Sequence, residues 1–181
     1  AGLAVQGGSK TDAHIDGALD QLKFGAEERP RLVHRLDKDT SGVLLLARTR
    51  KAAVDMTKAF QARETRKIYW ALVNGMPEHR SGMINAPLLK LPGSRGDLVQ
   101  VDEVNGKPAK TRFRMIDHLG KQATWLELEP LTGRTHQLRV HCQLMGNSIF
   151  GDGKYGERGG AIIELGIEER LHLHARTLII P

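Results

Sequence analysis

The sequence has little cysteine, few aromatic residues and no long apolar run. Cys142 is the only cysteine among 181 residues, so no intrachain disulfide can form and a reducing compartment, the cytoplasm, is expected. No apolar stretch approaches the roughly 20 residues needed to cross a membrane. Aromatic residues make up 4% of the chain, which argues against a broad platform for stacking nucleic-acid bases. These absences disfavour disulfide-stabilised secreted scaffolds and helical membrane proteins.

The positive charge of the chain is concentrated in one region. The net charge is +6, and residues 29–70 contain eleven Lys or Arg against four Asp or Glu. Such a region can be an ordinary solvated face or a contact surface for a polyanion. If RNA binds here, contacts between phosphates and Arg or Lys should supply most of the affinity.

The order of expected elements favours an α+β fold, with a mixed, mainly antiparallel sheet and flanking helices. The apolar run at residues 42–47 predicts a strand buried on both faces. Helices are expected over residues 11–24, where Thr11 can act as the cap, 51–65 and 134–145. Further strands are expected over residues 67–73, 83–89, 98–101, 110–117, 124–128 and 171–180. Because helices and strands do not alternate regularly, a doubly wound fold is disfavoured.

Polar residues crowd into the segment that precedes the apolar run. Residues 34–42 read His-Arg-Leu-Asp-Lys-Asp-Thr-Ser-Gly. The last four of these are typical of a turn, but a turn does not explain the charged residues before them. Catalytic groups often lie on loops that a rigid scaffold holds in place. The segment is therefore a candidate location for the chemistry.

Three sequence blocks resemble the RluA-type RNA pseudouridine synthases, in particular those of the large ribosomal subunit. The first is the polar segment just described. The second is Arg-Lys-Ile-Tyr-Trp-Ala-Leu-Val at residues 66–73, and the third is Leu-Thr-Gly-Arg-Thr-His-Gln-Leu-Arg-Val-His at residues 131–141. The resemblance implies that residues 1–181 are the catalytic domain of such an enzyme. The S4-like RNA-binding module and the terminal strands found in the family are expected to be missing from it.

The resemblance also implies an activity, the conversion of specific uridines in structured RNA, expected to be 23S ribosomal RNA, into pseudouridine. Asp37 corresponds to the catalytic aspartate, which can act on the sugar as nucleophile or as base. Tyr69 corresponds to the active-site tyrosine, and Arg134 to the arginine that pairs with the aspartate. Because substrate and product are isomers, no cofactor, metal or nucleotide is expected. A cytoplasmic monomer is the expected form.

Further residues are implied to bind the RNA or the target base. Arg35 corresponds to the arginine that enters the RNA stack when the target base leaves it. The whole implied set is His34, Arg35, Lys67, Thr135 and Leu138. Ordinary alternatives stay open, because Arg35 can be a surface arginine, and Tyr69 and Leu138 can be core residues.

Three other interpretations compete with this one. A metal site is disfavoured because His136 and His141 are five residues apart, and because His172 and His174 have no carboxylate or cysteine companion in the sequence. Residues 37–40, Asp-Lys-Asp-Thr, are similar to the Asp-x-Asp-x-Thr pattern of magnesium-dependent haloacid-dehalogenase-type phosphatases, but here the apolar strand follows the aspartates instead of preceding them. A non-catalytic RNA-binding module would keep the basic residues but would not need the aspartate.

Overall fold

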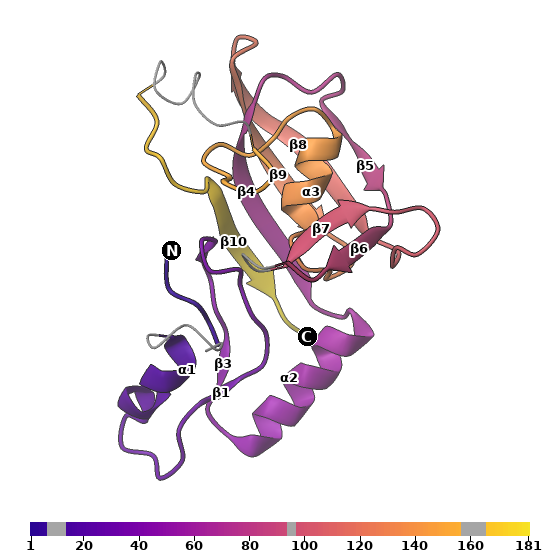
Figure 1. Ribbon diagram of the computed structural model, residues 1–181. Coiled ribbons are helices and arrows are strands. Elements are labelled where there is room, and N and C mark those ends of the chain that lie inside the picture. Colours follow the sequence, from indigo (N-terminus) through magenta and orange to yellow (C-terminus); the bar gives the residue numbers. More distant parts are fainter. Residues whose placement is uncertain (7–13, 94–96, 157–165) are drawn as a thin grey trace.

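A six-stranded sheet forms the centre of the computed structural model, which describes residues 1–6, 14–93, 97–156 and 166–181 (Figure 1). The strand order is β2-β10-β4-β9-β8-β5. Neighbouring strands are antiparallel except β2 and β10, which are parallel. The strands are β2 (Ser41–Gly42), β4 (Arg66–Asn74), β5 (Ser81–Asn85), β8 (Lys110–Leu119), β9 (Ala123–Pro130) and β10 (Leu173–Ile179). The predicted α+β class with a mixed, mainly antiparallel sheet is confirmed.

One face of this sheet is covered by α3 (Gln137–Leu144). A small hairpin, β6 (Leu88–Leu91) with β7 (Leu98–Val101), packs against the other side of the helix. The core between helix and sheet includes Ala71, Val73, Leu126, Leu128, Leu138 and Cys142. Because α3 lies between the sheet and the hairpin, its residues 137–142 are all buried, including the polar ones.

The remaining elements form an N-terminal lobe beyond one end of the sheet (Figure 1). They are α1 (Ile15–Ala18), the 3-10 helix η1 (Leu19–Leu22), β1 (Arg31–Leu32), β3 (Leu46–Ala47) and α2 (Arg50–Ala62). Thr49 caps α2, since its hydroxyl accepts the N–H of Ala52 at 3.1 Å. The helix ends at Arg63, which takes up a left-handed conformation with φ 60°.

The prediction of one buried strand over residues 42–47 is wrong. Gly42 pairs with Ala175 of β10, whereas Leu46 pairs with Leu32 of β1. The chain therefore crosses from the central sheet to the lobe within this run. Val43, at the crossing, is 44% exposed. An apolar run of this length does not reveal whether its two ends belong to the same sheet.

Other element boundaries also differ from the sequence-based expectation. Residues 83–89 contain parts of β5 and β6, because Pro87 separates the two strands. The helix expected from residue 134 begins at Gln137, since His136 before it is left-handed with φ 51°. The helix expected over residues 11–24 is α1 followed by η1, and Thr11 lies outside the described residues.

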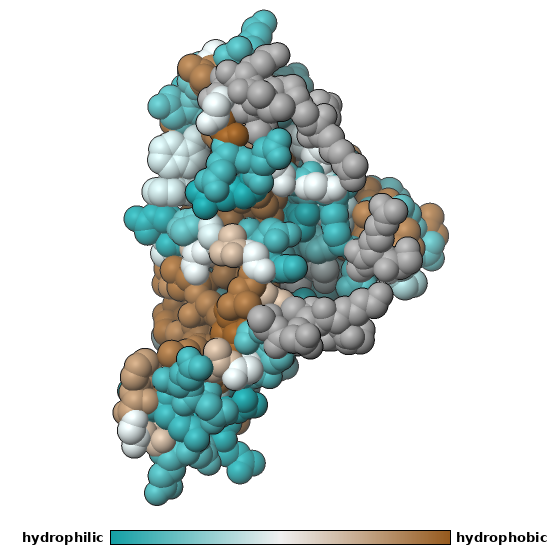
Figure 2. All heavy atoms as spheres, turned by 60° about the vertical axis from the view of Figure 1, so that its left-hand side comes forward, coloured by the Kyte–Doolittle hydropathy of each residue, from teal (hydrophilic) through white to brown (hydrophobic). Residues whose placement is uncertain are grey.

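Apolar side chains reach the surface where the lobe meets the sheet. The exposed ones include Leu3, Val43, Ile179 and Ile180. Figure 2 shows apolar residues gathered about midway along the molecule, between two hydrophilic ends. None of the described helices is long and apolar enough to cross a membrane.

Candidate active site

A cavity of about 360 Å³ lies between the N-terminal lobe and the α3 face of the sheet. One wall is the polar segment before β2, together with Phe60 of α2. The other wall consists of Lys67 and Tyr69 of β4, Leu173 of β10 and the segment that leads into α3. All eight residues proposed from the sequence line this cavity, namely His34, Arg35, Asp37, Lys67, Tyr69, Arg134, Thr135 and Leu138. The fold thus brings together residues that lie 100 positions apart in the chain.

Asp37 is placed by a turn between the lobe and the sheet. The N–H of Thr40 donates to the carbonyl of Asp37 at 2.9 Å, and the chain then enters β2. β2 is fixed by its parallel pairing with β10, where Ser41 lies opposite His174. The Asp37 side chain is only partly exposed. It is therefore a carboxylate that a substrate in the cavity can reach.

His34 fastens the same segment to the lobe. Its Nε2 accepts the N–H of Leu45 at 2.8 Å, and its ring stacks on Phe60 with 4.9 Å between ring centroids. Burial, with a smaller contribution from the charge of Lys67, lowers the pKa of His34 to about 4. The ring is therefore neutral near pH 7, and the proton is on Nδ1. These contacts indicate that His34 positions the loop, besides lining the cavity.

Tyr69 faces the cavity from the middle of β4, opposite Leu128 of β9. Burial, and secondly the charge of Asp37, raises the pKa of its hydroxyl to about 12. The hydroxyl therefore stays protonated at neutral pH and can donate a hydrogen bond into the cavity. Burial also lowers the pKa of the neighbouring Lys67 ammonium.

The predicted ion pair between Arg134 and Asp37 is not present among the described residues. Arg134 lines the cavity, but its Nε donates to the carbonyl of Pro108 at 3.2 Å. Its backbone N–H donates to Oε1 of Gln137 at 3.0 Å. The loop before α3 therefore directs this guanidinium toward the β7–β8 connection.

Gln137, which was not predicted from the sequence, anchors the wall around Arg134. Its Oε1 also accepts the hydroxyl of Thr132 at 2.7 Å, and its Nε2 donates to the carbonyl of Lys110 and the hydroxyl of Thr111. The Thr111 hydroxyl in turn donates to Nδ1 of His141, whose Nε2 donates to the carbonyl of Ala86. Every polar side-chain group in this buried network has a hydrogen-bond partner, so the network holds the start of α3 rigidly against β8.

A second arginine that lines the cavity, Arg139, is held in a fixed position and was not predicted from the sequence. Arg139 donates twice to the buried carboxylate of Asp152, at 2.7 and 2.6 Å. Burial alone would lower the pKa of Arg139, but the hydrogen bonds and charge of Asp152 and the charge of Asp37 keep it raised. The only signal in the sequence was that Arg139 belongs to the same block as Arg134.

His136, for which the sequence disfavours a metal role, lines the cavity. The hydroxyl of Tyr155 accepts the N–H of Val99 at 2.9 Å and lies 2.7 Å from Nδ1 of His136. Donation by that hydroxyl to Nδ1 satisfies all three groups and leaves the imidazole proton on Nε2. Burial lowers the pKa of His136, and the charge of Asp37 partly offsets this. The cavity that Asp37 lines thus also contains a cation, a neutral imidazole and a protonated phenol.

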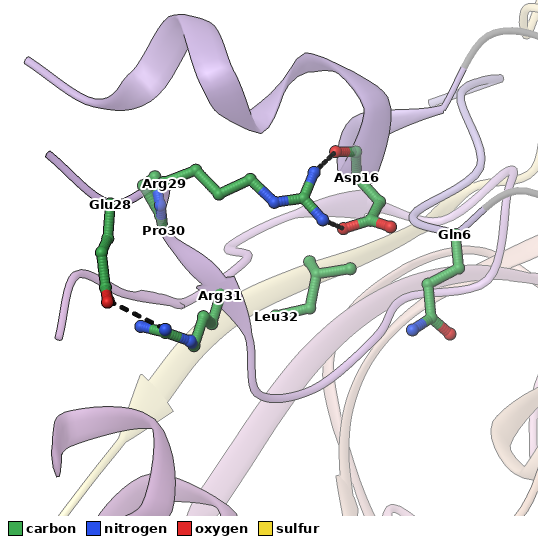
Figure 3. A pocket seen from close by; sticks show the side chains of 7 residues that line it. All are labelled: Gln6, Asp16, Glu28, Arg29, Pro30, Arg31 and Leu32. Carbon is green, nitrogen blue, oxygen red and sulfur yellow. Dashed lines mark hydrogen bonds and ion pairs between the residues drawn. The ribbon is translucent and has the colours of Figure 1, made fainter. Parts of the chain in front are cut away.

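A second cavity, of about 480 Å³, lies on the lobe away from these residues (Figure 3). Its charged side chains are already engaged with one another. Arg31 pairs with Glu28 at 2.8 Å, and Arg29 contacts both the carbonyl and the carboxylate of Asp16. These contacts make it a structural feature of the lobe. Within the described part of the chain, no group of three or more His, Cys, Asp or Glu is arranged to hold a metal ion.

Comparison with known proteins identifies the same family that the sequence blocks resemble. The family model described as RNA pseudouridylate synthase matches residues 1–144. The chain is 44% identical over 177 residues to RNA pseudouridine synthase 4, mitochondrial, of Arabidopsis thaliana, covering 86% of this chain and 37% of that protein. It is 42% identical over 185 residues to ribosomal large subunit pseudouridine synthase C of Vibrio cholerae, covering 98% of this chain and 55% of the relative.

A solved structure matches the whole arrangement. Human RNA pseudouridylate synthase domain containing 4 superposes with a TM-score of 0.82 at 29% identity, over 99% of this chain and 78% of that one. Human RNA pseudouridylate synthase domain containing 1 superposes with a TM-score of 0.77 at 31% identity, with the same coverage. The chain spans about half the length, or less, of the curated relatives named above.

Proposed function

The chain belongs to the RNA pseudouridylate synthase family, and on that premise we propose that it converts uridine to pseudouridine in structured RNA. The substrate we propose is ribosomal RNA of the large subunit, the 23S RNA of bacteria. This choice is supported by the resemblance to a relative named ribosomal large subunit pseudouridine synthase C. Residues 1–181 act in this proposal as one catalytic domain.

The observation that carries the proposal is the surroundings of Asp37. A reachable carboxylate lies in a cavity with a protonated tyrosine hydroxyl and the fixed cation Arg139. The reaction breaks the N1–C1′ bond of uridine and forms a C5–C1′ bond. The base gains a hydrogen on N1 and loses the one on C5, so the net change is an isomerisation. Asp37 acts on the ribose as nucleophile or base, and Arg139 supplies a positive charge in the same cavity.

Tyr69 and Arg35 have complementary roles in this proposal. The ring of Tyr69 packs on the target uracil, and its hydroxyl, which stays protonated, takes part as a hydrogen-bond donor. Arg35 is exposed at the cavity rim, where a guanidinium can stack in the place of the extruded base and also contact phosphate. Leu138 and Thr135 shape the wall, and Lys67 and Arg134 contact the RNA. Because the reaction is an isomerisation, the proposal includes no cofactor.

The proposal describes a cytoplasmic protein that acts as a monomer. The cavity is built from residues of one chain, so a second copy is not needed to complete it. The single, buried Cys142 is compatible with a reducing compartment.

The test is the release of tritium from unmodified large-subunit ribosomal RNA labelled with [5-³H]uridine. The wild-type chain is compared with Asp37→Asn in the presence of EDTA. We expect release by the wild type and a loss of at least about a thousandfold in the variant, because the reacting carboxylate is removed. Asp39→Asn is the matched control, since Asp39 is an exposed aspartate two residues further along. Equal release by wild type and Asp37→Asn would refute the assignment, and release that requires Mg²⁺ would favour a metal-dependent enzyme.

A further inference from the structure

Both tryptophans of the chain lie together on the sheet face opposite the catalytic cavity. Side chains alternate between the two faces of a strand, so Trp70 points away from the cavity that Tyr69 lines. Trp125 of β9 lies diagonally across from it, because Trp70 is paired with Glu127. The two indoles meet edge to face with 4.8 Å between ring centroids. The chain has only two tryptophans, and the fold gathers both at one place.

A cation and a hollow accompany the two rings. The guanidinium of Arg176, on β10, lies 4.8 Å from the centroid of Trp70. Beside the rings is a cavity of about 350 Å³, lined also by Arg170, His172 and His174. Trp125 is 36% exposed, so one ring is accessible from solvent. An indole and a stacked guanidinium next to a hollow form a surface on which a planar aromatic ligand can stack.

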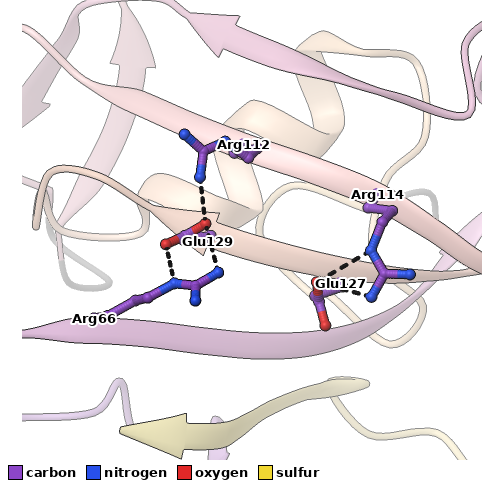
Figure 4. A network of polar contacts seen from close by, with 5 residues as sticks. All are labelled: Arg66, Arg112, Arg114, Glu127 and Glu129. Carbon is purple, nitrogen blue, oxygen red and sulfur yellow. Dashed lines mark hydrogen bonds and ion pairs between the residues drawn. The ribbon is translucent and has the colours of Figure 1, made fainter. Parts of the chain in front are cut away.

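Arginines extend this face toward its far edge (Figure 4). Glu129 is shared by Arg66 and Arg112, and Glu127 pairs with Arg114 at 3.0 Å. Three guanidiniums therefore share two carboxylates, which leaves one positive charge over. More than half of each of these three arginine side chains is exposed. Among the described residues Arg176 has no carboxylate partner, so its charge adds to the surplus. Asp117, which is exposed and lies opposite Trp125, offsets one of these charges, and one positive charge remains in excess.

We propose that this face, centred on Trp70, Trp125 and Arg176, is a second RNA-contact surface. It takes an unpaired base on the exposed indole, and the neighbouring arginines hold the flanking phosphates. Sheet faces that combine aromatic rings with cations bind single-stranded RNA by base stacking and phosphate contact. A protein partner is a weaker match, because the centres of protein interfaces are depleted in charge and this face is rich in it.

This inference rests on the proposed function only for the choice of RNA as ligand. The two surfaces lie on opposite sides of the sheet, so an RNA segment that flanks the target uridine would have to pass around the sheet to reach the tryptophans. Stacking on the tryptophans would not change the chemical reaction at Asp37. It would strengthen the binding of RNAs that have an unpaired strand next to the target uridine. It would be seen in affinity more than in the rate of the bound complex.

Tryptophan fluorescence tests the inference directly, since both tryptophans belong to the surface. The full chain carrying Asp37→Asn is titrated with a 12-nucleotide single-stranded oligouridylate, and also with a blunt RNA duplex of equal length. We expect saturable quenching by the single strand and little by the duplex. Trp125→Leu should weaken binding of a dye-labelled copy of the single strand about 5- to 150-fold. Arg176→Gln should remove about one phosphate contact. The slope of log K against log salt for RNA binding should therefore become shallower by roughly 0.7.

Two comparisons make the test decisive. Lys51→Gln removes one exposed positive charge on α2, away from this face, and should leave the fluorescence titration unchanged. A Trp125→Leu chain that binds the single strand as tightly as its parent would overturn the proposal, as would equal quenching by the duplex. Quenching that follows protein concentration without RNA would indicate that a second copy occupies the face, which would also overturn it. Because the readout needs no pseudouridine formation, it stands apart from the test of the catalytic proposal.

Discussion

His34 holds the loop that carries Asp37 in place. Its ring lies on Phe60, and its Nε2 holds the N–H of Leu45, so the chain on both sides of Asp37 is fixed. The hydrogen bond from Leu45 requires the neutral ring, because a protonated Nε2 cannot accept a hydrogen bond. The lowered pKa of His34 is therefore tied to the position of Asp37.

The stability of the protein should therefore fall as the pH is lowered from about 6.5 to about 4. In that window the unfolded chain takes up a proton on His34 that the folded chain excludes, so the free energy of unfolding decreases with falling pH. One proton taken up by the unfolded chain alone would change the free energy of unfolding by about 1.4 kcal/mol per pH unit. We expect roughly half of that slope, because the His34 ring is partly exposed. Urea denaturation across this pH range measures the slope.

Substitutions distinguish the contribution of His34 to the pH dependence of stability from that of the other histidines. His34→Gln retains an acceptor for Leu45 but cannot be protonated, so its slope should be shallower than that of the wild type. His79→Gln, at an exposed position, should keep the wild-type slope. A His34→Gln slope equal to that of the wild type would show that His34 is not the titrating group.

At the residue scale, the sequence predicted which residues line the site better than it predicted which residues they contact. Asp37 and Tyr69 could be selected because their sequence blocks carry a recognisable pattern, and both line one cavity. The partner of Asp37 could not be predicted in the same way. Arg134 and Arg139 are both cationic residues of one block, and only the fold shows that Arg134 donates to the carbonyl of Pro108 and Arg139 to the buried carboxylate of Asp152.

At the scale of elements, β2 joins the catalytic loop to the central sheet through one close backbone contact. Gly42 has φ +113°, and a Cβ atom there would lie 2.2 Å from the carbonyl oxygen of Ala175. The next residue, Val43, donates its N–H to that same carbonyl at 2.9 Å. A side chain at residue 42 would therefore separate β2 from β10 and release the loop that carries Asp37.

We predict that Gly42→Ala costs at least about 2 kcal/mol of unfolding free energy and lowers the rate of pseudouridine formation. Urea denaturation and the tritium-release assay measure the two effects. Gly120→Ala is the matched control, because Gly120 also has a positive φ, of +52°, but nothing lies within 4 Å of the added Cβ. That control should lose about 1 kcal/mol and keep its activity. If Gly42→Ala lost no more stability than Gly120→Ala, the close approach would not be the cause.

Element type could be predicted where side-chain periodicity and flanking residues agreed. β4 was found nearly to its ends, since residues 67–73 have strand composition and an Asn-Gly turn follows. The prediction of one strand over residues 42–47 failed because the two ends of this run pair with different strands, β10 and β1. That pairing depends on the whole fold. Local composition cannot encode such a crossing.

At the scale of the molecule, the cavity lies between two parts whose apolar cores differ in size. The sheet and α3 share a large apolar core, whereas the buried apolar residues of the lobe are few and include Leu19, Ala47 and Ala59. The lobe supplies the wall with Asp37, and the sheet supplies the wall with Tyr69. The relative position of the two walls should therefore be the softest feature of the site.

Hydrogen exchange should reveal this difference. Amides of α2 are expected to exchange at a lower opening free energy than amides of β4 and β9, and RNA that fills the cavity should protect α2 more than β9. Exchange with and without RNA, followed by mass spectrometry of peptides, measures both. The β6–β7 hairpin is the internal comparison, since none of its described residues lines the cavity. Uniform opening energies across α2, β4 and β9 would show that the molecule unfolds as one unit.

The sole thiol of the chain lies inside the packing between α3 and the sheet. Cys142 is fully buried, and burial raises its pKa to about 12, so it stays in the unreactive protonated form while the protein is folded. A cysteine introduced on the surface would then be the only site open to a maleimide dye or a spin label. Pairs of such labels, one on α2 and one on the β8–β9 turn, would report how far the two walls of the cavity move when RNA enters, with the native cysteine left in place.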